Sequence, residues 1–524
     1  MTSLVHHFIE QYAANSPQAT VLLYQDQSLD YATLNATIMR WAAHLRALGL
    51  AENDRVALYL PKQFPAVFGI YASMAAGGVA VPINPGLKAE QVLHIVRDSG
   101  ATILLTHRTR ANLLADHLAA CPALRHLFIL DAQPDEASAM AWPCSVHPGS
   151  ILDQAITAPM PSRLAADMAA ILYTSGSTGL AKGVVLSHAN LVTGTQSVTH
   201  YLHNTADDRL LAVLPLSFDY GLSQLTCAFA VGASVVLLDY LVPNDIIQAI
   251  PTYQITGLAA VPTLWQQLAR LNWPAVPHLR YLTNSGGTLA RTSIQALQKA
   301  LPDTAVYVMY GLTEAFRSTY LPPDQLDQRP GSIGKAIPHA ELLLLNADNQ
   351  ECAPDEPGEL VHAGALVAQG YWNNPEASAA CFKPLPHSLT GSKKPNIAVW
   401  SGDIMRRDAD GYLYFLGRRD AQIKTAGYRV SPEEIESVVS RLPDVTCAIA
   451  QGIPHAALGQ AIILWVQATC TVAKIRRYCQ AQLPNFMLPQ DYLILPEIPL
   501  NQNGKPDRTA MLRDYLAETT ETIV

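Results

Sequence analysis

The sequence predicts an α/β fold, with a large N-terminal domain of packed mixed sheets and helices and a small α+β C-terminal domain. Short apolar runs alternate with amphipathic stretches of helical length over most of the chain, and the alternation shortens after residue 420. The chain also has 524 residues, more than a single hydrophobic core usually organises. We therefore expect an N-terminal domain at residues 1–419 and a C-terminal domain at residues 420–524.

The first hundred residues show the alternation most clearly. Residues 56–60 and 79–83 are apolar runs of strand length, and residues 64–76 between them have the length of a helix. A helical stretch at 90–98 and an apolar run at 101–105 follow. Such strand–helix–strand units predict a largely parallel sheet. Similar apolar runs recur at residues 169–172, 184–186, 210–214, 234–238 and 257–261.

The last part of the chain has shorter units, as expected for a small separate domain. The patterns predict helices at 433–441 and 473–483 and strands at 445–450 and 462–466. Before this domain, the stretch 384–396 is rich in Pro, Gly, Ser and Lys and predicts a surface loop.

The composition indicates a globular protein. Hydrophobic residues make up 49% of the chain and charged residues 15%, and the net charge of -8 gives no reason to expect a nucleic-acid binder. No apolar run approaches the roughly 18 residues of a membrane span, and the N-terminus does not resemble a signal peptide. The 8 cysteines form no CxxC pair, which favours reduced thiols and a cytoplasmic location.

The strongest chemical signal is the glycine-rich segment 173–184, YTSGSTGLAKGV, which lies between two apolar runs. Glycines allow a backbone to approach an anion closely, and hydroxyl and amide groups donate hydrogen bonds to phosphate oxygens. Lys182 adds a positive charge. The spacing of glycine and lysine differs from that of a Walker A loop. A flexible linker would rarely contain this lysine between two strands, so the segment predicts a phosphate-binding loop.

Four other blocks carry weaker signals when each is taken alone. In YGLTEA (310–315), the aromatic ring can stack on a nucleotide base, and the carboxylate can bind Mg²⁺. In WSGD (400–403), Asp403 is either an acceptor for ribose hydroxyls or a turn aspartate. The remaining blocks are IKTAGYRV (423–430) and NQNGK (501–505), and the second of these is also typical of a hairpin tip.

Together, in this order, the blocks resemble the adenylate-forming superfamily, which includes acyl-CoA synthetases, nonribosomal-peptide adenylation enzymes and luciferase-like enzymes. The resemblance extends from about Tyr31 to Arg508. It implies a mobile C-terminal domain and a reaction in which a carboxylic acid and ATP, with Mg²⁺, form an acyl-adenylate. The acyl group then passes to a phosphopantetheine thiol, either on a carrier protein or on CoA.

The resemblance also implies roles for individual residues of the N-terminal domain. Catalytic roles fall on Thr174, Lys182 and Glu314, with Glu314 as the Mg²⁺ ligand and Thr313 as the α-phosphate contact. The remaining nucleotide-binding positions are the phosphate loop Ser175, Gly176, Ser177, Thr178 and Gly179, the adenine walls Ser285, Gly286, Gly287, Tyr310 and Gly311, and the ribose contacts Asp403 and Arg418.

Three features of the C-terminal domain follow from the same resemblance. Asp420 lies at the hinge, and Lys505 contacts the carboxylate and the α-phosphate during adenylation. Lys424 and Gly427 lie on the segment that rotates inward for thioester formation.

The resemblance places an acyl pocket around Phe218-Asp219, a pair that amino-acid-activating members use to bind the substrate ammonium. Gly221 departs from those members, which commonly carry serine there. Arg317 either meets an acidic or polar group of the substrate or forms a structural salt bridge in the pocket wall. The implied lining is Asp219, Tyr220, Ser223, Ala259, Leu282, Asn284, Met309, Arg317 and Ser318, with Lys505 at the mouth.

Two functions remain open on the sequence. The first is a free-standing ligase that adenylates an amino acid and loads a separate acyl or peptidyl carrier protein, because no carrier-attachment motif of the Gly-x-Asp-Ser-Leu type is present. The second is an acyl-CoA synthetase for a small or polar acid. A catalytically silent homologue is disfavoured, since it need not retain Lys182, Glu314, Asp403 and Lys505. The run YGLTEAFRSTY (310–320) also resembles bacterial stand-alone ligases of natural-product clusters.

Overall fold

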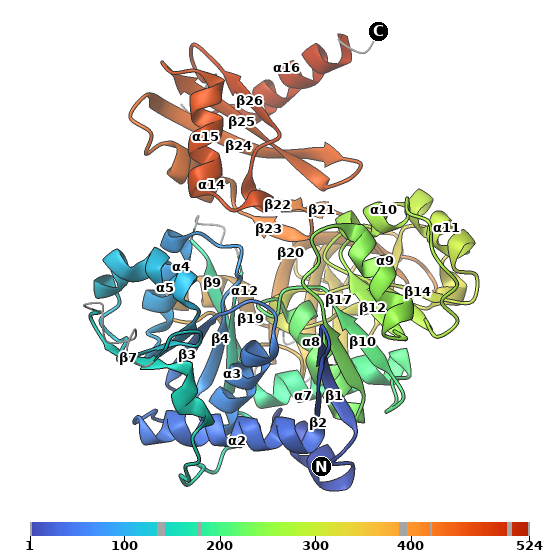
Figure 1. The fold of residues 1–524 in the computed structure, drawn as a ribbon. Coiled ribbons are helices and arrows are strands. Elements are labelled where there is room, and N and C mark those ends of the chain that lie inside the picture. Colours follow the sequence, from blue (N-terminus) through green and yellow to red (C-terminus); the bar gives the residue numbers. More distant parts are fainter. Residues whose placement is uncertain are drawn as a thin grey trace. The chain divides into compact units, whose positions relative to one another are not determined.

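The computed structural model describes residues 3–133, 142–174, 180–386, 396–419, 422–499 and 506–521. The chain divides into two compact units, coloured along the sequence in Figure 1. The first unit comprises residues 1–174 and 182–419, and the second comprises residues 175–181 and 420–524. Both units mix helices and strands, as the sequence predicts. No described helix has the length and apolar character needed to cross a membrane.

Within the described residues, one sheet of the first unit has seven strands and contains the strand–helix–strand units expected near the N-terminus. Its neighbouring strands run parallel, except that the last two are antiparallel. In sheet order, the strands are β7 (Ser145–Pro148), β6 (His126–Ile129), β5 (Ile103–Thr106), β3 (Arg55–Tyr59), β4 (Val79–Pro82), β8 (Met168–Thr174) and β9 (Lys182–Ser187).

The second sheet of the first unit has fourteen strands within the described residues. Its middle section, from β1 through β14, is parallel, and its pairings beyond β14 are antiparallel. In sheet order, the strands are β17 (Ala340–Leu345), β18 (Gly358–Gly364), β20 (Ile397–Arg407), β21 (Leu413–Arg418), β16 (Ser332–Ala336), β15 (Thr319–Leu321), β14 (Ala305–Tyr310), β13 (Tyr281–Asn284), β12 (Gly257–Ala260), β10 (Arg209–Ala212), β11 (Ser234–Leu237), β1 (Thr20–Tyr24) and β2 (Gln27–Asp30), with β19 (Phe382–Pro384) beside β20.

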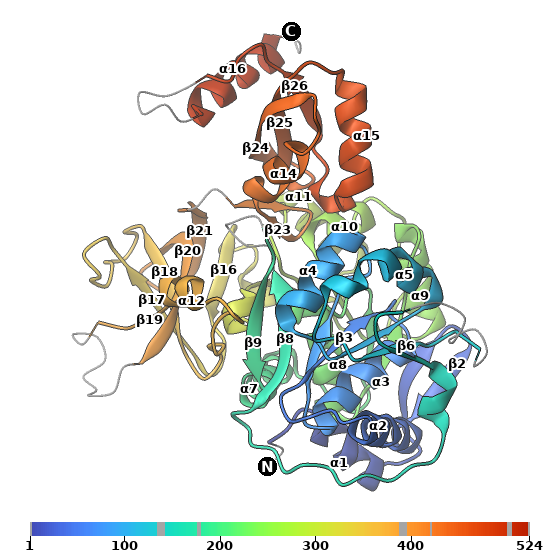
Figure 2. The same ribbon diagram turned by 90° about the vertical axis from the view of Figure 1, so that its left-hand side faces the viewer.

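Helices pack against both sheets, as Figures 1 and 2 show. Helix α3 contacts β3 and β4, while α8 contacts α7, β10 and β11. The helices of this unit are α1 (His7–Asn15), α2 (Tyr31–Ala47), α3 (Phe64–Ala75), α4 (Ala89–Ser99), α5 (Arg108–Leu114), α7 (His188–Leu202), α8 (Asp219–Val231), α9 (Pro243–Thr252), α10 (Pro262–Leu268), α11 (Arg291–Ala300) and α12 (Pro375–Cys381), with 3₁₀ turns η1 (Ala115–Ala120), η2 (Gly149–Asp153), η3 (Thr313–Ala315) and η4 (Pro323–Gln325).

Local sequence explains where two of the helices near the site begin and end. The Ser187 side chain accepts a hydrogen bond from the Asn190 N–H and so caps the start of α7. Helix α8 ends at Gly232, whose φ of +79° is a left-handed conformation that glycine adopts without strain. Both helices bury most of their apolar residues in the main core.

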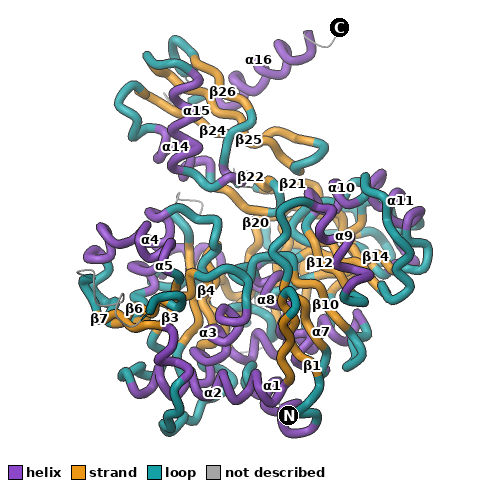
Figure 3. Tube along the Cα trace, viewed as in Figure 1, coloured by secondary structure: helices purple, strands orange, loops and turns teal. Residues whose placement is uncertain are grey.

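The second unit has the short elements predicted from its sequence, and Figure 3 shows its helices and strands. Its described residues form a five-stranded sheet, which is covered by α14 (Pro432–Val439) and α15 (Val472–Gln482). Its strands are β22 (Ile423–Thr425), β23 (Tyr428–Val430), β24 (Val445–His455), β25 (Gly459–Ala468) and β26 (Asp491–Ile494), followed by α16 (Arg508–Glu521), with a 3₁₀ turn η5 (Asn485–Met487).

The expected surface loop at 384–396 is only partly described. Pro384 ends β19, and the Asn396 carbonyl accepts a hydrogen bond of 2.9 Å from the Leu385 N–H. The rest of the segment, residues 387–395, lies outside the described residues.

Candidate active site

The predicted nucleotide and acyl positions follow the ends of neighbouring strands. Strand β13 ends at Asn284 and is directly followed by Ser285, while β14 ends at Tyr310. The two strands are parallel neighbours, so both ends lie at the same edge of the sheet. In parallel sheets, ligands bind outside the carboxyl ends of the strands. The candidate site therefore lies where the fold class places one.

Asp219 and Tyr220 form the first turn of α8. Asp219 is half-buried, and its Oδ1 accepts a hydrogen bond of 3.4 Å from the Thr313 hydroxyl. The Tyr220 hydroxyl lies 2.6 Å from the hydroxyl of Thr283 on β13. These contacts join the predicted acyl-binding residues to β13 and to the predicted phosphate contact Thr313.

Arg317 lies next to this turn and is only 2% exposed. Its Nη1 donates to the Ser285 hydroxyl at 2.8 Å, and its guanidinium lies 4.5 Å from the centroid of the Tyr220 ring. Its Nε has no hydrogen-bond partner among the described residues, and none of their carboxylates forms an ion pair with it. The structural salt bridge considered for Arg317 is therefore not found in the described part of the chain.

Glu314, the predicted magnesium ligand, is 4% exposed on the turn η3. Its Oε1 accepts a hydrogen bond of 2.8 Å from the Tyr371 hydroxyl, and the Lys182 Nζ lies 5.6 Å from the centroid of the Tyr371 ring. Tyr371 thus lies between two predicted catalytic residues. Burial, followed by the charge of Glu314, raises the pKa of Tyr371 and keeps its hydroxyl protonated as a donor.

Sequence reasoning missed Tyr371. The Gly370-Tyr371-Trp372 segment is held against β9 by main-chain hydrogen bonds, from the Val185 N–H to the Gly370 carbonyl and from the Trp372 N–H to the Gly183 carbonyl. An aromatic residue after a glycine carries no periodic signal. The only hint in the sequence was the glycine itself; in the structure Gly370 has a φ of +123°, a backbone conformation that other residues rarely adopt.

The phosphate loop is described only at its two ends. Strands β8 and β9 are antiparallel, and Thr174 lies directly opposite Lys182 in their register. Before the loop, the Tyr173 hydroxyl donates to Asp98 at 2.6 Å and fixes the strand end to helix α4. The predicted loop residues Ser175, Gly176, Ser177, Thr178 and Gly179 lie outside the described residues.

The structure brings three predicted nucleotide contacts into one cluster. The carboxylate of Asp403 is fully buried and accepts hydrogen bonds from the Tyr310 hydroxyl on one oxygen and from Arg418 on the other. Asp403 lies opposite Arg418 in the register of β20 and β21. Asp403 is therefore a buried strand residue, and the alternative of a turn aspartate is wrong.

Glycines shape the backbone around this edge. Gly286 has a left-handed φ of +87°. A Cβ on Gly311 would lie 2.8 Å from the Phe316 carbonyl oxygen, and a Cβ on Gly287 would lie 3.2 Å from Pro262. Gly311 therefore allows the turn after β14 to pass close to the segment that carries Arg317. The adenine-binding role of these glycines stays a prediction.

Three other predicted pocket residues are buried and engaged with protein groups. The Ser223 hydroxyl donates to the Tyr220 carbonyl at 2.9 Å, and the Met309 sulfur accepts from the Tyr201 hydroxyl at 2.9 Å. The Ser318 hydroxyl lies 2.9 Å from Nδ1 of His362, a fully buried histidine that the sequence analysis did not single out. Burial lowers the pKa of His362 to about 3, so this imidazole is neutral.

The predicted residues of the second unit are described only in part. Lys424 lies on β22, and its N–H donates to Gln460 at 2.7 Å. Gly427 has a φ of +83° in the turn between β22 and β23. The predicted hinge Asp420 and the predicted catalytic Lys505 lie outside the described residues.

Comparison with known proteins decides the family. The profile of the AMP-binding enzyme family matches residues 9–372, and that of the AMP-binding enzyme C-terminal domain matches residues 434–505. The chain belongs to the AMP-binding enzyme family. Its fold is the adenylate-forming fold that the sequence predicts.

Two curated relatives illustrate the range of this family. Nonribosomal peptide synthetase ecdA from Aspergillus rugulosus is 31% identical over 99% of this chain, which spans only 7% of that much longer protein. Novobiocin biosynthesis protein H from Streptomyces niveus is 29% identical over 96% of this chain and 81% of its own length.

A solved structure matches the AMP-binding enzyme over nearly its whole length. A variant of o-succinylbenzoate CoA synthetase from Bacillus subtilis has a TM-score of 0.81 and 25% identity, covering 96% of this chain and 97% of its own. The same synthetase has also been solved with ATP and a magnesium ion, with a TM-score of 0.68.

Proposed function

We propose that this ligase activates an amino acid with ATP and Mg²⁺ and transfers the aminoacyl group to the phosphopantetheine thiol of a separate carrier protein. The observation that carries the proposal is the position of Asp219. Its carboxylate lies on the first turn of α8 and contacts Thr313, the predicted α-phosphate contact, at 3.4 Å. A cationic ammonium bound by Asp219 would bring the neighbouring substrate carboxylate close to that phosphate.

The electrostatics of this turn support an ammonium ligand. Asp219 is half-buried, and a carboxylate in such a place favours a cationic partner. The charge of Asp219 acts on Tyr220, whose pKa is raised first of all by burial and also by this carboxylate. A negative potential is therefore present at the place where the ammonium of an amino acid is proposed to bind.

The proposed magnesium site rests on the chemistry of its donors. Mg²⁺ prefers oxygen ligands and is commonly held by one or two carboxylates together with phosphate oxygens. The buried carboxylate of Glu314 is such a ligand, and the Tyr371 hydroxyl orients it. These residues fit the ion, which when bound would neutralise charge on the phosphates.

The remaining nucleotide contacts follow from the same assignment. Lys182 and the loop before it hold the phosphates, and Tyr310, Asp403 and Arg418 hold the adenosine. Lys505 neutralises the charge that develops as the substrate carboxylate attacks the α-phosphorus and pyrophosphate leaves. The second step, attack of a thiol on the mixed anhydride, mostly requires positioning.

Transfer to a carrier protein is supported by similarity to a nonribosomal peptide synthetase and to a novobiocin biosynthesis protein. Both relatives match almost the whole of this chain. A second candidate function, an acyl-CoA synthetase for a polar acid, is favoured by the similarity to o-succinylbenzoate CoA synthetase and by Gly221 at a position where serine was expected.

Pyrophosphate exchange with paired substrates tests the amino-acid proposal. Amino acids and the same acids without the amine are compared on the wild type and on Asp219→Ala. Removing the partner of a buried ammonium costs about 3–5 kcal/mol, which corresponds to a loss of roughly two to four orders of magnitude in kcat/KM. Asp219→Ala is expected to lose exchange with the amino acid and to retain exchange with the amine-free analogue.

Two results would contradict this assignment. An unchanged preference for the amine in Asp219→Ala would show that Asp219 does not bind it. Faster exchange of the wild type with amine-free acids, followed by thioester formation with CoA, would establish the second candidate function.

A further inference from the structure

We propose that Arg317 binds a second carboxylate of the substrate, so that the activated acid is a dicarboxylic one, in this case an amino dicarboxylic acid. The inference deepens the proposed function and rests on it for the amine. It concerns the end of the substrate remote from the carboxylate that reacts with ATP. Three observations on described residues carry it.

The first observation is the burial of a guanidinium without a counter-ion. Arg317 is 2% exposed, yet no Asp or Glu of the described chain pairs with it. Burying an unpaired charge is strongly unfavourable unless a partner is supplied. Arginine has five N–H donors, and one hydrogen bond, to the Ser285 hydroxyl at 2.8 Å, uses one of them. A carboxylate is the ligand that the guanidinium fork binds best, through two parallel hydrogen bonds.

The second observation is that Arg317 and Asp219 are separate charges that both lie near one aromatic residue. The guanidinium lies 4.5 Å from the centroid of the Tyr220 ring. Burial raises the pKa of Tyr220, the Arg317 charge lowers it, and the Asp219 charge raises it. Both charges therefore act on Tyr220, and Arg317 forms no ion pair with Asp219 or with any other described carboxylate. A substrate that carries a cationic group and an anionic group at different positions complements this arrangement.

The third observation is a buried acceptor on the same wall. Asn284 is 1% exposed, and its Nδ2 donates to the Gly287 carbonyl at 3.1 Å. Its Oδ1 is buried and has no hydrogen-bond partner among the described residues. Asn284 directly precedes Ser285, the residue that holds Arg317. A buried polar group without a hydrogen-bond partner is unfavourable, so both Asn284 and Arg317 favour a polar ligand over an apolar one.

Two sets of four related acids separate the effect of the amine from the effect of the second carboxylate. Glutamate, glutamine, glutarate and glutaramate differ only in the presence of the amine and in the charge at the remote end, and aspartate, asparagine, succinate and succinamate form a shorter set. Pyrophosphate exchange is measured for all eight on the wild type, Arg317→Met, Arg317→Lys and the control Arg291→Met. Arg291 is an exposed residue at the start of α11.

The wild type is expected to prefer the dicarboxylic member of each pair over its amide by about 100-fold or more in kcat/KM, because the amide lacks the negative charge and the second acceptor oxygen that the guanidinium fork binds. In Arg317→Met, this preference should fall to within about threefold. Arg317→Lys should keep only part of it, since lysine lacks the bidentate fork. Arg291→Met should behave as the wild type.

A thermal-unfolding measurement distinguishes this role from a structural one. If Arg317 binds the second carboxylate, glutarate and succinate raise the Tm of the wild type more than their amides do, and the difference disappears in Arg317→Met. If Arg317 is needed only to pack against Tyr220, Arg317→Met lowers the Tm and leaves the ligand preference unchanged, which overturns the proposal.

The outcomes for the two proposals are separate. Faster exchange with glutarate or succinate than with the corresponding amino acid refutes the amino-acid function and leaves the assignment of Arg317 intact. Exchange with amides equal to or faster than with the corresponding dicarboxylic acids overturns the assignment of Arg317, whichever result the amine gives. Exchange restricted to acids with a single carboxylate overturns it as well.

Discussion

Tyr371 is the residue that the structure adds to the predicted site. Its hydroxyl donates to Glu314 at 2.8 Å, and the Lys182 ammonium lies 5.6 Å from the centroid of its ring. A residue that orients a metal ligand affects the reaction through that ligand. It does not itself contact the reacting atoms. We therefore regard Tyr371 as a positioning residue for Glu314.

Tyr371→Phe is expected to weaken magnesium binding while leaving the fold intact. Loss of a hydrogen bond to a metal ligand typically costs about 10–100-fold in metal affinity or activity. A titration of Mg²⁺ in the pyrophosphate-exchange assay should show a half-saturating concentration raised by about tenfold or more. A loss of rate that excess Mg²⁺ does not change would show that Tyr371 acts elsewhere, for example through the cation–π contact with Lys182.

Phe316 is another residue that the sequence did not indicate. It has φ of +58° and ψ of -82°, a strained conformation for a bulky side chain, and it is 1% exposed. Its ring packs on α7 so closely that a Cβ on Gly194 would lie 2.5 Å from it. This packing holds the strained turn and thereby fixes the backbone on either side, at Glu314 and Arg317.

At the scale of single elements, the start of α8 explains the departure at Gly221. A Cβ there would lie 2.0 Å from the Pro215 carbonyl oxygen, so the first turn of the helix packs directly on the preceding segment. Serine at this position, as in many amino-acid-activating members, requires the turn to move. The difference at 221 thus reflects a closer approach of two backbones and leaves Asp219 in the first turn.

Gly221→Ser is expected to destabilise the protein by about 1–3 kcal/mol, the usual cost of forcing extra atoms into a packed site. Chemical denaturation measures the free energy of unfolding, with Gly417→Ser as the matched control, because a Cβ on Gly417 would meet no atom within 4 Å. Equal stability of the two variants would mean that the turn of α8 moves freely, and serine would then be compatible with this site.

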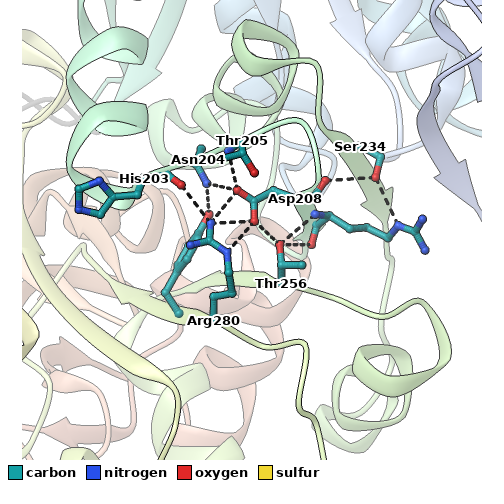
Figure 4. Close-up of polar contacts among 9 residues, drawn as sticks. His203, Asn204, Thr205, Asp208, Ser234, Thr256 and Arg280 are labelled. Atoms are coloured by element: carbon teal, nitrogen blue, oxygen red, sulfur yellow. Dashed lines mark hydrogen bonds and ion pairs between the residues drawn. The ribbon is translucent and has the colours of Figure 1, made fainter. Parts of the chain in front are cut away.

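A buried polar network fixes the other end of the parallel strands, as Figure 4 shows. Asp208, 2% exposed, accepts hydrogen bonds from Arg280, Thr256, Thr205 and Asn204. Burial disfavours the ionised form of Asp208, but these hydrogen bonds outweigh burial and lower its pKa. Since the network joins β10, β12 and β13 before they begin, it sets their register and plays a structural role.

Asp208→Ala is expected to lower the free energy of unfolding by about 2–3 kcal/mol, because it removes the ionised acceptor that four donors share. Urea denaturation at neutral pH measures the loss. The folded-state pKa lies below the ordinary 3.8, so this contribution is present above pH 3.8 and disappears as the pH falls through the folded-state pKa. A difference between wild type and variant that persists unchanged in strong acid would contradict the assignment.

At the scale of the whole molecule, three buried neutral histidines make the first unit sensitive to acid. Burial lowers the pKa of His6 and His362 to about 3 and that of His188 to about 4, against an ordinary value of 6.5. His188 accepts a hydrogen bond from the Val5 N–H at 3.2 Å through Nδ1, which requires an unprotonated nitrogen. In the unfolded chain, all three bind protons at a higher pH than in the fold.

The free energy of unfolding should therefore fall as the pH is lowered from 6.5 towards 4. The unfolded state binds more protons in this window, and each histidine lowers the free energy of unfolding by about 1.4 kcal/mol for each unit by which the pH falls. Urea denaturation at about pH 7.0 and about pH 5.5 should show a loss of about 4 kcal/mol for the three together. His362→Gln should remove about a third of that loss. The same loss in the variant would show that His362 does not contribute.

The sequence by itself determined the family and the alternation of strands and helices, and it predicted the nucleotide-binding residues. The periodicities of strands and helices and the glycine-rich turns depend on neighbours along the chain, so a sequence shows them directly. Lys182 and Asp403 can be identified because each belongs to a short motif, and the motifs follow one another in a fixed order. The roles that the superfamily assigns to these residues stay predictions, as do the domain boundary at 419/420 and the hinge at Asp420.

Only the tertiary structure decided which groups meet. Tyr371 lies 57 residues beyond its partner Glu314, and Asp403 lies 93 residues beyond Tyr310. The contact between Arg317 and Ser285, and the lack of a carboxylate partner for that arginine in the described residues, depend on how three parallel strands and α8 pack. Such contacts between distant residues depend on the order of the strands in the sheet and on burial, and no local pattern in a single sequence encodes them.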